Sequence, residues 1–178
     1  MTYEHTDGRV LWITGLSGAG KTTLAKALLP HMGPRVVLLD GDELRTALNL
    51  ADSGFDKESR KGLAFTYARL ARMIALQRFT VVVATISLFH ELHAWNRAHL
   101  PGYYEVWLDV PEEECRRRDP KRLYAASACG QLQDMACGNM VEMPQNPDLV
   151  LHFGHDSDLS VSVQAILTML NTHKSRAC

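Results

Sequence analysis

The sequence has few cysteines, and none of them form a C-x-x-C pair. The four are Cys115, Cys129, Cys137 and Cys178, and this spacing argues against a zinc site. Reduced thiols are therefore the expectation. A disulfide between Cys129 and Cys137 is an alternative that depends on how the chain folds.

Long apolar runs and a strong net charge are also missing. No apolar run approaches the roughly 18 to 20 residues of a membrane span, and residues 1–8 lack the basic-then-apolar pattern of a signal peptide. We therefore expect a cytoplasmic protein without a membrane partner. The formal net charge of -1 gives no broad attraction to nucleic acid, so any anion site must be local.

The composition that is present suits one globular domain. The chain has 178 residues, of which 46% are hydrophobic and 22% charged, and this size allows one ordinary domain with a substantial core. No repeat or linker divides it. We expect a single domain over residues 1–178.

One glycine-rich stretch carries a phosphate-binding pattern. Residues 15–22 read G-L-S-G-A-G-K-T and match G-x-x-x-x-G-K-[ST], with an apolar run before and a helical pattern after. Such a loop turns its N–H groups and a helix N-terminus towards an anion. The pattern predicts ATP, with Lys21 on its phosphates and the Thr22 hydroxyl on Mg²⁺. A glycine-rich turn with a solvated lysine is the competing interpretation. The predicted nucleotide-binding residues are Gly15, Ser17, Gly18, Ala19, Gly20, Lys21, Thr22 and Thr23.

Strand-like and helical patterns alternate along the chain. This alternation predicts a P-loop NTPase-type three-layer α/β/α fold around a five-stranded parallel sheet. Residues 119–147 lack periodicity and are expected to form a mobile lid. In such sheets ligands bind beyond the carboxyl ends of the strands. The predicted strands are 10–13, 36–39, 80–84, 104–109 and 149–153, and the later predicted helices cover 42–48, 59–77, 91–100 and 159–170, with another that Pro111 opens.

Two carboxylates follow the second predicted strand. Asp40 can serve the magnesium shell and Asp42 can accept a hydroxyl proton, the two roles that phosphoryl transfer needs. Helix capping by both is the alternative. Arg45 lies one helical step further and suits an anionic acceptor. Of the basic run before the lid, Arg118 and Lys121 are the candidates for binding phosphate, against a solvated helix end.

Three further side chains have open interpretations. Phe55 can stack on a base or fill a small core contact. His90 and His93 lie on neighbouring turns of a predicted helix and could pair on a metal, but no third ligand accompanies them. A surface or acceptor-pocket role is preferred for both.

Over roughly residues 9–151 the sequence resembles the adenylylsulfate (APS) kinases, which use MgATP to phosphorylate the ribose 3'-hydroxyl of adenosine 5'-phosphosulfate. The resemblance implies that Asp42 is the catalytic acid or base, with Lys21 beside the phosphates. It also implies acceptor-binding roles for Arg45, Phe55, Arg60, Ile86, Ser87 and Lys121. The motifs that carry it are 15–23 (GLSGAGKTT), 39–45 (LDGDELR), Gly54-Phe55 with Arg60, Ile86-Ser87, Arg118-Asp119-Pro120-Lys121 with Leu123-Tyr124, and 144–147 (PQNP).

The acceptor side departs from the family pattern. The Asn-Ile-Arg-Arg run is replaced by residues 63–66 (LAFT), the proline after Ile-Ser by Leu88, and the Lys-x-Phe-Thr-Gly motif by residues 133–137 (QDMAC). Loss of these cations weakens recognition of a sulfated tail. The chain therefore resembles more closely the divergent cytidine diphosphoramidate kinases of capsule pathways, which phosphorylate a ribose 3'-hydroxyl.

Two other functions stay open. One is a genuine APS kinase of sulfate assimilation that tolerates these substitutions. The other is a non-catalytic nucleotide-binding switch, for which the sequence offers no effector motif. The oligomeric state is also open, and a homodimer is among the alternatives.

Overall fold

The computed structural model describes residues 8–50, 56–118, 141–152 and 158–174. Strands and helices alternate through them, as the sequence predicts. The strands are β1 (Arg9–Thr14), β2 (Val36–Asp40), β3 (Thr80–Ala84), β4 (Tyr103–Asp109) and β5 (Leu149–His152). The helices are α1 (Lys21–Leu28), the short 3₁₀ helix η1 (Leu29–His31), α2 (Gly41–Ala47), α3 (Lys57–Ala75), α4 (His90–His99), α5 (Glu112–Arg118) and α7 (Leu159–Lys174).

The five strands form one parallel sheet in the order β2-β3-β1-β4-β5. The register aligns Ile13 with Ala84 on one side and with Val106 on the other. β1 therefore lies at the centre of the sheet. The loop that follows it emerges between the ends of β3 and β4.

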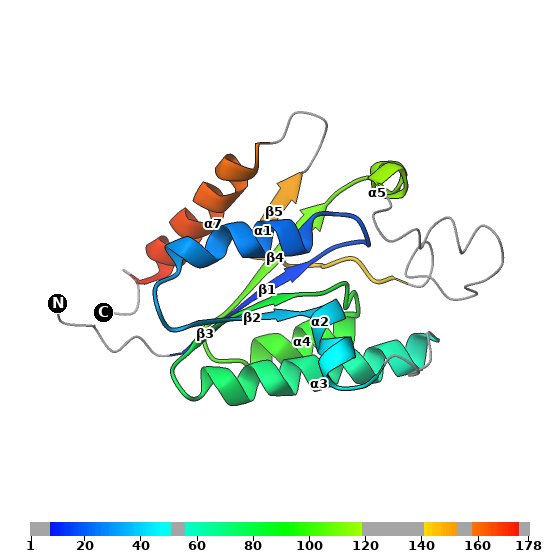
Figure 1. Cartoon of the computed structure of the whole chain (residues 1–178), viewed down its shortest axis with the longest axis horizontal. Coiled ribbons are helices and arrows are strands. Elements are labelled where there is room, and N and C mark those ends of the chain that lie inside the picture. The colour runs from blue at the N-terminus through cyan, green and yellow to red at the C-terminus, as the bar shows by residue number, and fades with distance from the viewer. Residues whose placement is uncertain (1–7, 51–55, 119–140, 153–157, 175–178) are drawn as a thin grey trace.

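Helices cover both faces of the sheet, which confirms the predicted three-layer α/β/α fold. α1 and α7 lie on one face, and α2, α3 and α4 lie on the other (Figure 1). Every residue of β3 is buried, as expected for a parallel strand covered on both sides. One core cluster packs under α1 and α7, and the second packs under α3 and α4.

The observed element limits differ from the predicted ones by a few residues. α3 begins at Lys57, where the Asp56 side chain caps it by accepting from Ser59 N. The last strand ends at His152, and the predicted Phe153 lies outside the described residues. Within the described ranges, no helix is long and apolar enough to cross a membrane.

Candidate active site

The predicted phosphate loop links β1 to α1 at the carboxyl edge of the sheet. Gly15, Gly18 and Gly20 have φ values of 151°, 79° and 97°, in the region that favours glycine. A Cβ on Gly18 would lie 2.8 Å from the backbone oxygen of Cys115 in α5. The loop is therefore closely packed as well as sharply turned, and larger residues do not fit at this point.

Lys21 is folded over the loop. Its ammonium nitrogen donates to the carbonyl oxygens of Gly15 and Leu16, at 3.0 and 2.6 Å. A lysine in this place puts its positive charge directly against the loop that would cradle phosphate. The neighbouring Thr22 is half-buried and Thr23 is exposed.

A short hydrogen-bonded corner joins the phosphate loop to β2. The Thr22 hydroxyl donates to Asp40 Oδ2 at 2.6 Å, and Asp42 N donates to Asp40 Oδ1 at 3.0 Å. Asp40 is 4% exposed and is the N-cap of α2, whereas Asp42 is exposed in the first turn. The capping alternative is thus correct for Asp40, and it coexists with the contact to Thr22. Asp42 keeps its carboxylate at the open edge of the sheet.

The corner fits a magnesium ion. Thr22 and Asp40 bring a hydroxyl and a carboxylate within hydrogen-bond distance, and hard oxygen ligands of this kind suit Mg²⁺. Among the described residues, no group of three or more histidine, cysteine, aspartate or glutamate side chains could hold a metal. Mg²⁺ usually keeps several water ligands and takes others from substrate phosphates, so one or two protein ligands are enough to hold it.

Arg45 lies beside the same corner, close to Tyr67 of α3. The Tyr67 hydroxyl donates to Gly41 O at 3.0 Å. Burial raises the pKa of Tyr67, and the positive charge of Arg45 opposes that rise. Tyr67 therefore holds the start of α2 while Arg45 keeps a cation near Asp42. The sequence predicts only that Tyr67 lies in the helix over 59–77 and gives no sign of this contact.

Ile86 and Ser87 form a turn just beyond β3. The Thr14 hydroxyl donates to Ile86 O, and the hydroxyls of Thr85 and Ser87 lie 2.9 Å apart. Ser87 is 7% exposed and has a φ of 30°. The predicted substrate-binding pair thus lies at the same edge as the phosphate loop and Asp42.

The two other described candidates lie at the ends of helices. The Arg60 guanidinium lies over the Phe89 ring, 5.9 Å from its centroid. Arg118 donates to Glu114 Oε1 at 2.7 Å, and its neighbour Arg117 pairs with the same carboxylate. These two arginines lower the pKa of Glu114 to about 2. The ion pair with Glu114 therefore offsets part of the positive charge of Arg118 within α5. Phe55, Lys121 and residues 133–137, together with most of the predicted lid, lie outside the described residues.

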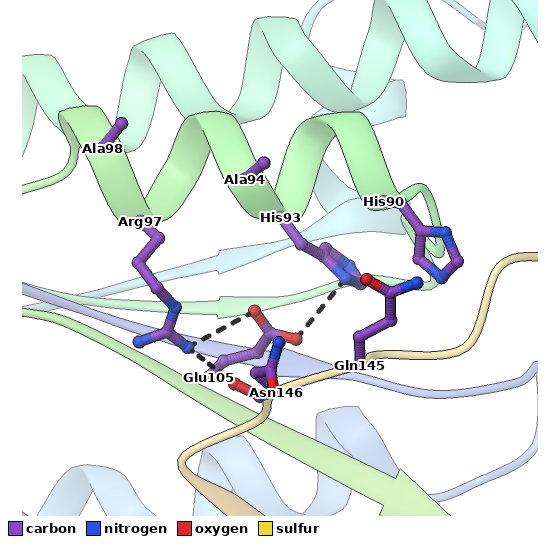
Figure 2. Close-up of a pocket in the computed structure, with 8 residues that line it drawn as sticks. All are labelled: His90, His93, Ala94, Arg97, Ala98, Glu105, Gln145 and Asn146. Atoms are coloured by element: carbon purple, nitrogen blue, oxygen red, sulfur yellow. Dashed lines mark hydrogen bonds and ion pairs between the residues drawn. The ribbon is translucent and has the colours of Figure 1, made fainter.

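A cavity of about 430 Å³ lies between α4, Glu105 of β4 and residues 145–146. Figure 2 shows His93 and Arg97 projecting from α4 towards Glu105 of β4. Arg97 also pairs with Asp148, at 2.9 Å. Sequence reasoning did not identify Glu105 or Arg97. The available signal was a carboxylate in the interior of a largely apolar strand, whose other carboxylate, Asp109, is at the strand end.

Comparisons with known proteins agree with this geometry. The model of the adenylylsulphate kinase family matches residues 7–152. A cytidine diphosphoramidate kinase of Campylobacter jejuni is 31% identical over 90% of this chain and 95% of its own length. An adenylyl-sulfate kinase of Deinococcus deserti is 39% identical over 93% of this chain and 91% of its own.

The fold is shared with a solved member of the same family. The APS kinase CysC of Mycobacterium tuberculosis, solved in complex with AMPPNP and APS, superposes with a TM-score of 0.82. It is 33% identical and the match covers 93% of this chain and 98% of that one. Sequence, fold and the geometry of the phosphate loop together show that this chain belongs to the adenylylsulphate kinase family and is a phosphotransferase acting on a hydroxyl group.

Proposed function

We propose that this protein transfers the γ-phosphate of ATP to the ribose 3'-hydroxyl of a nucleotide-like acceptor, with cytidine diphosphoramidate as the favoured acceptor. The observation that supports this reaction most directly is the hydrogen bond from Thr22 to Asp40, at 2.6 Å. Asp40 immediately precedes α2, and the first turn of α2 bears Asp42. A donor loop, a metal site and a base at one sheet edge are the parts that phosphoryl transfer requires.

Each residue has a separate role in this reaction. Lys21 and the loop N–H groups hold the triphosphate and offset the charge that develops on the transferring group. Thr22 and Asp40 hold Mg²⁺, which would neutralise charge on the phosphates. Asp42 accepts the proton of the acceptor hydroxyl, and Arg45 binds the acceptor's anionic part beside it.

The acceptor preference rests on residues 63–66 of α3. Ala64 is 2% exposed, and the Phe65 ring packs edge-on against Trp95 at 5.9 Å. The Thr66 hydroxyl donates to Gly62 O of its own helix. The positions that hold arginines in the APS kinase pattern thus carry an aromatic packing contact and a short hydroxyl. A less anionic acceptor tail is compatible with this surface, which supports cytidine diphosphoramidate over APS.

The adenylyl-sulfate kinase of Deinococcus deserti is 39% identical and the cytidine diphosphoramidate kinase of Campylobacter jejuni 31%, so APS remains the second candidate. Both kinds of named kinase match nearly the whole chain. The test is a coupled ADP-release assay on the full chain with each acceptor, followed by identification of the phosphorylated hydroxyl in the product. We expect higher kcat/KM with cytidine diphosphoramidate and a 3'-phosphate. Higher kcat/KM with APS would reverse the preference, and ADP release that no acceptor stimulates would contradict the proposed reaction.

A further inference from the structure

The turn at residues 85–87 has a conformation that needs support from outside. Ser87 has a φ of 30°, a positive value that is uncommon for residues other than glycine. The Ser87 carbonyl oxygen lies 3.0 Å from Nε2 of His93, a residue near the start of α4. The Phe89 amide also donates to this oxygen, at 3.2 Å. The His93 ring thus reaches the turn from α4, as the Thr14 hydroxyl reaches Ile86 O from β1.

This contact fixes the protonation of the imidazole. A carbonyl oxygen only accepts, so Nε2 of His93 must carry the proton and donate it. In the neutral ring, Nδ1 is then an acceptor. Among the described residues Nδ1 makes no hydrogen bond, and Glu105 Oε1 lies 3.4 Å from it.

Glu105 is 2% exposed, and its carboxylate contacts both His93 and Arg97 (Figure 2). Its Oε2 accepts from the Tyr103 hydroxyl at 2.9 Å and lies 3.8 Å from Arg97. Its amide donates to Asp148 Oδ2, at 2.8 Å. Burial lowers the pKa of His93 to about 4 and raises that of Glu105, so both shifts favour a neutral pair. The contacts of the Glu105 side chain hold it beside the imidazole, where it limits movement of the ring.

The turn at residues 85–87 packs closely against Gly41, the residue before the proposed base Asp42. A Cβ on Gly41 would lie 3.1 Å from Thr85 Oγ1 and 3.3 Å from Thr85 Cβ. Thr85 therefore leaves little room for a larger side chain at Gly41. Because Thr85 and Ser87 are hydrogen-bonded to each other, we expect a shift of Ser87 to move the proposed acceptor-binding pair Ile86-Ser87 and, through Gly41, to affect Asp42.

We propose that His93 is a positioning residue, which holds the 85–87 turn against the Asp42 corner and so sets how the acceptor is bound. The proposal rests on the proposed function, because this turn affects turnover only if the acceptor lies against it. His93 touches neither substrate nor phosphate in this role. It acts through the carbonyl of Ser87.

The kinetic test compares two variants in the full chain, with cytidine diphosphoramidate and APS as the acceptor probes. His93→Gln keeps an N–H at the place of Nε2, and His93→Met keeps similar volume without a donor. We expect His93→Met to raise acceptor KM by about tenfold and His93→Gln by less than about threefold, with KM for MgATP within about twofold for both, since one hydrogen bond contributes about this much. Equal increases in both KM values for both variants, or no change in either, would overturn the proposal.

A second measurement does not depend on any acceptor. Amide hydrogen exchange at residues 85–89 should be faster in His93→Met than in the wild type, and unchanged in His93→Gln. Unchanged exchange in His93→Met overturns the positioning role even if turnover is normal. If no acceptor is phosphorylated, the proposed function fails while this exchange result still decides the inference.

The unmodified protein gives a third measurement that needs no variant to fold. Nitrogen-15 NMR of the histidine rings at neutral pH should show His93 protonated at Nε2. An unprotonated Nε2 would overturn the proposal, because the ring could then not donate to Ser87 O. Glu105→Gln should preserve the signal, since its amide can donate to Nδ1 while its oxygen accepts from Tyr103.

Discussion

Thr22 Oγ1 lies 2.6 Å from Asp40 Oδ2, and this hydrogen bond ties the first turn of α1 to the end of β2. Asp40 also accepts from the amide of Asp42. The phosphate loop and the helix that bears the proposed base therefore share one carboxylate. We therefore expect substitutions of Thr22, Asp40 or Asp42 to lower the catalytic rate more than they lower the stability of the fold.

Removing the Thr22 hydroxyl should weaken the metal site. We expect Thr22→Ala to lower kcat/KM for MgATP by about 10- to 100-fold, because hydrogen bonds to charged groups contribute about 1.5–3 kcal/mol. The variant should also need more Mg²⁺ for half-maximal rate, which a Mg²⁺ titration at fixed ATP measures. Thr22→Ser keeps the hydroxyl and is the matched control. Equal losses in both variants would argue for a packing effect of the methyl group.

Asp42→Asn should reduce the chemical step. Its amide cannot accept the acceptor proton, and loss of a general base lowers kcat by about 10²- to 10⁴-fold. Both KM values should change little, since Asp42 is exposed and Asp40 still caps the helix. Steady-state kinetics with each substrate varied measures this. Turnover that survives within a few-fold, with binding unchanged, would mean that another group takes the proton.

Gly41 and Gly62 provide a matched pair of glycine substitutions. A Cβ at Gly41 meets Thr85 Oγ1 at 3.1 Å, whereas nothing lies within 4 Å of one at Gly62 in α3. We expect Gly62→Ala to stabilise the protein by about 0.5–1 kcal/mol through helix propensity and to leave kcat unchanged. Gly41→Ala should lower kcat by displacing the Asp42 corner. Denaturant unfolding and steady-state assays on both variants measure these effects, and a fully active Gly41→Ala would show that the corner has room to move.

Acid should destabilise the protein through His93. Burial lowers its folded pKa from 6.5 to about 4, so between these values the unfolded chain binds a proton that the folded protein does not. This contribution is complete above the unfolded pKa and is lost as pH falls towards the folded one. The raised pKa of Glu105 acts in the opposite direction, so a comparison with a variant that keeps Glu105 is needed.

His93→Gln is that comparison. Between about pH 7.5 and about pH 5, the unfolding free energy of the wild type relative to His93→Gln should fall by at most about 2 kcal/mol. Urea unfolding at several pH values measures it. The other charged groups near the imidazole, Arg97, His90 and Glu142, are present in both proteins. A difference that stays constant with pH would show that His93 titrates normally.

The fold could be predicted because its local patterns are strong. A strand such as Val81-Val82-Val83 is apolar at every position and is buried at every position, which is typical of a parallel sheet covered on both faces. The order β2-β3-β1-β4-β5 could not be derived from such runs. It depends on which strands pair over long distances, and apolar runs of similar composition do not distinguish among partners.

The candidate site divides in the same way. The phosphate loop could be predicted because its spacing alone determines its turns. The pair of His93 and Glu105 could not, because the two residues come from different elements and meet only after α4 packs on β4. His90 and His93 looked equivalent in sequence. The structure separates them: His90 is exposed and contacts Met143 O, while His93 is buried against Ser87 O.

The placement of α4 has an evolutionary consequence. The helix contacts the 85–87 turn through His93, while the phosphate loop packs against Leu108 of β4 and Cys115 of α5, which belong to the core cluster on the opposite face of the sheet. In the proposed role of His93, substitutions along α4 should therefore change which hydroxyl compound is phosphorylated and leave nucleotide binding unchanged. Directed evolution towards new acceptors should therefore begin with a library on this single helix, where a change in acceptor specificity need not weaken ATP binding.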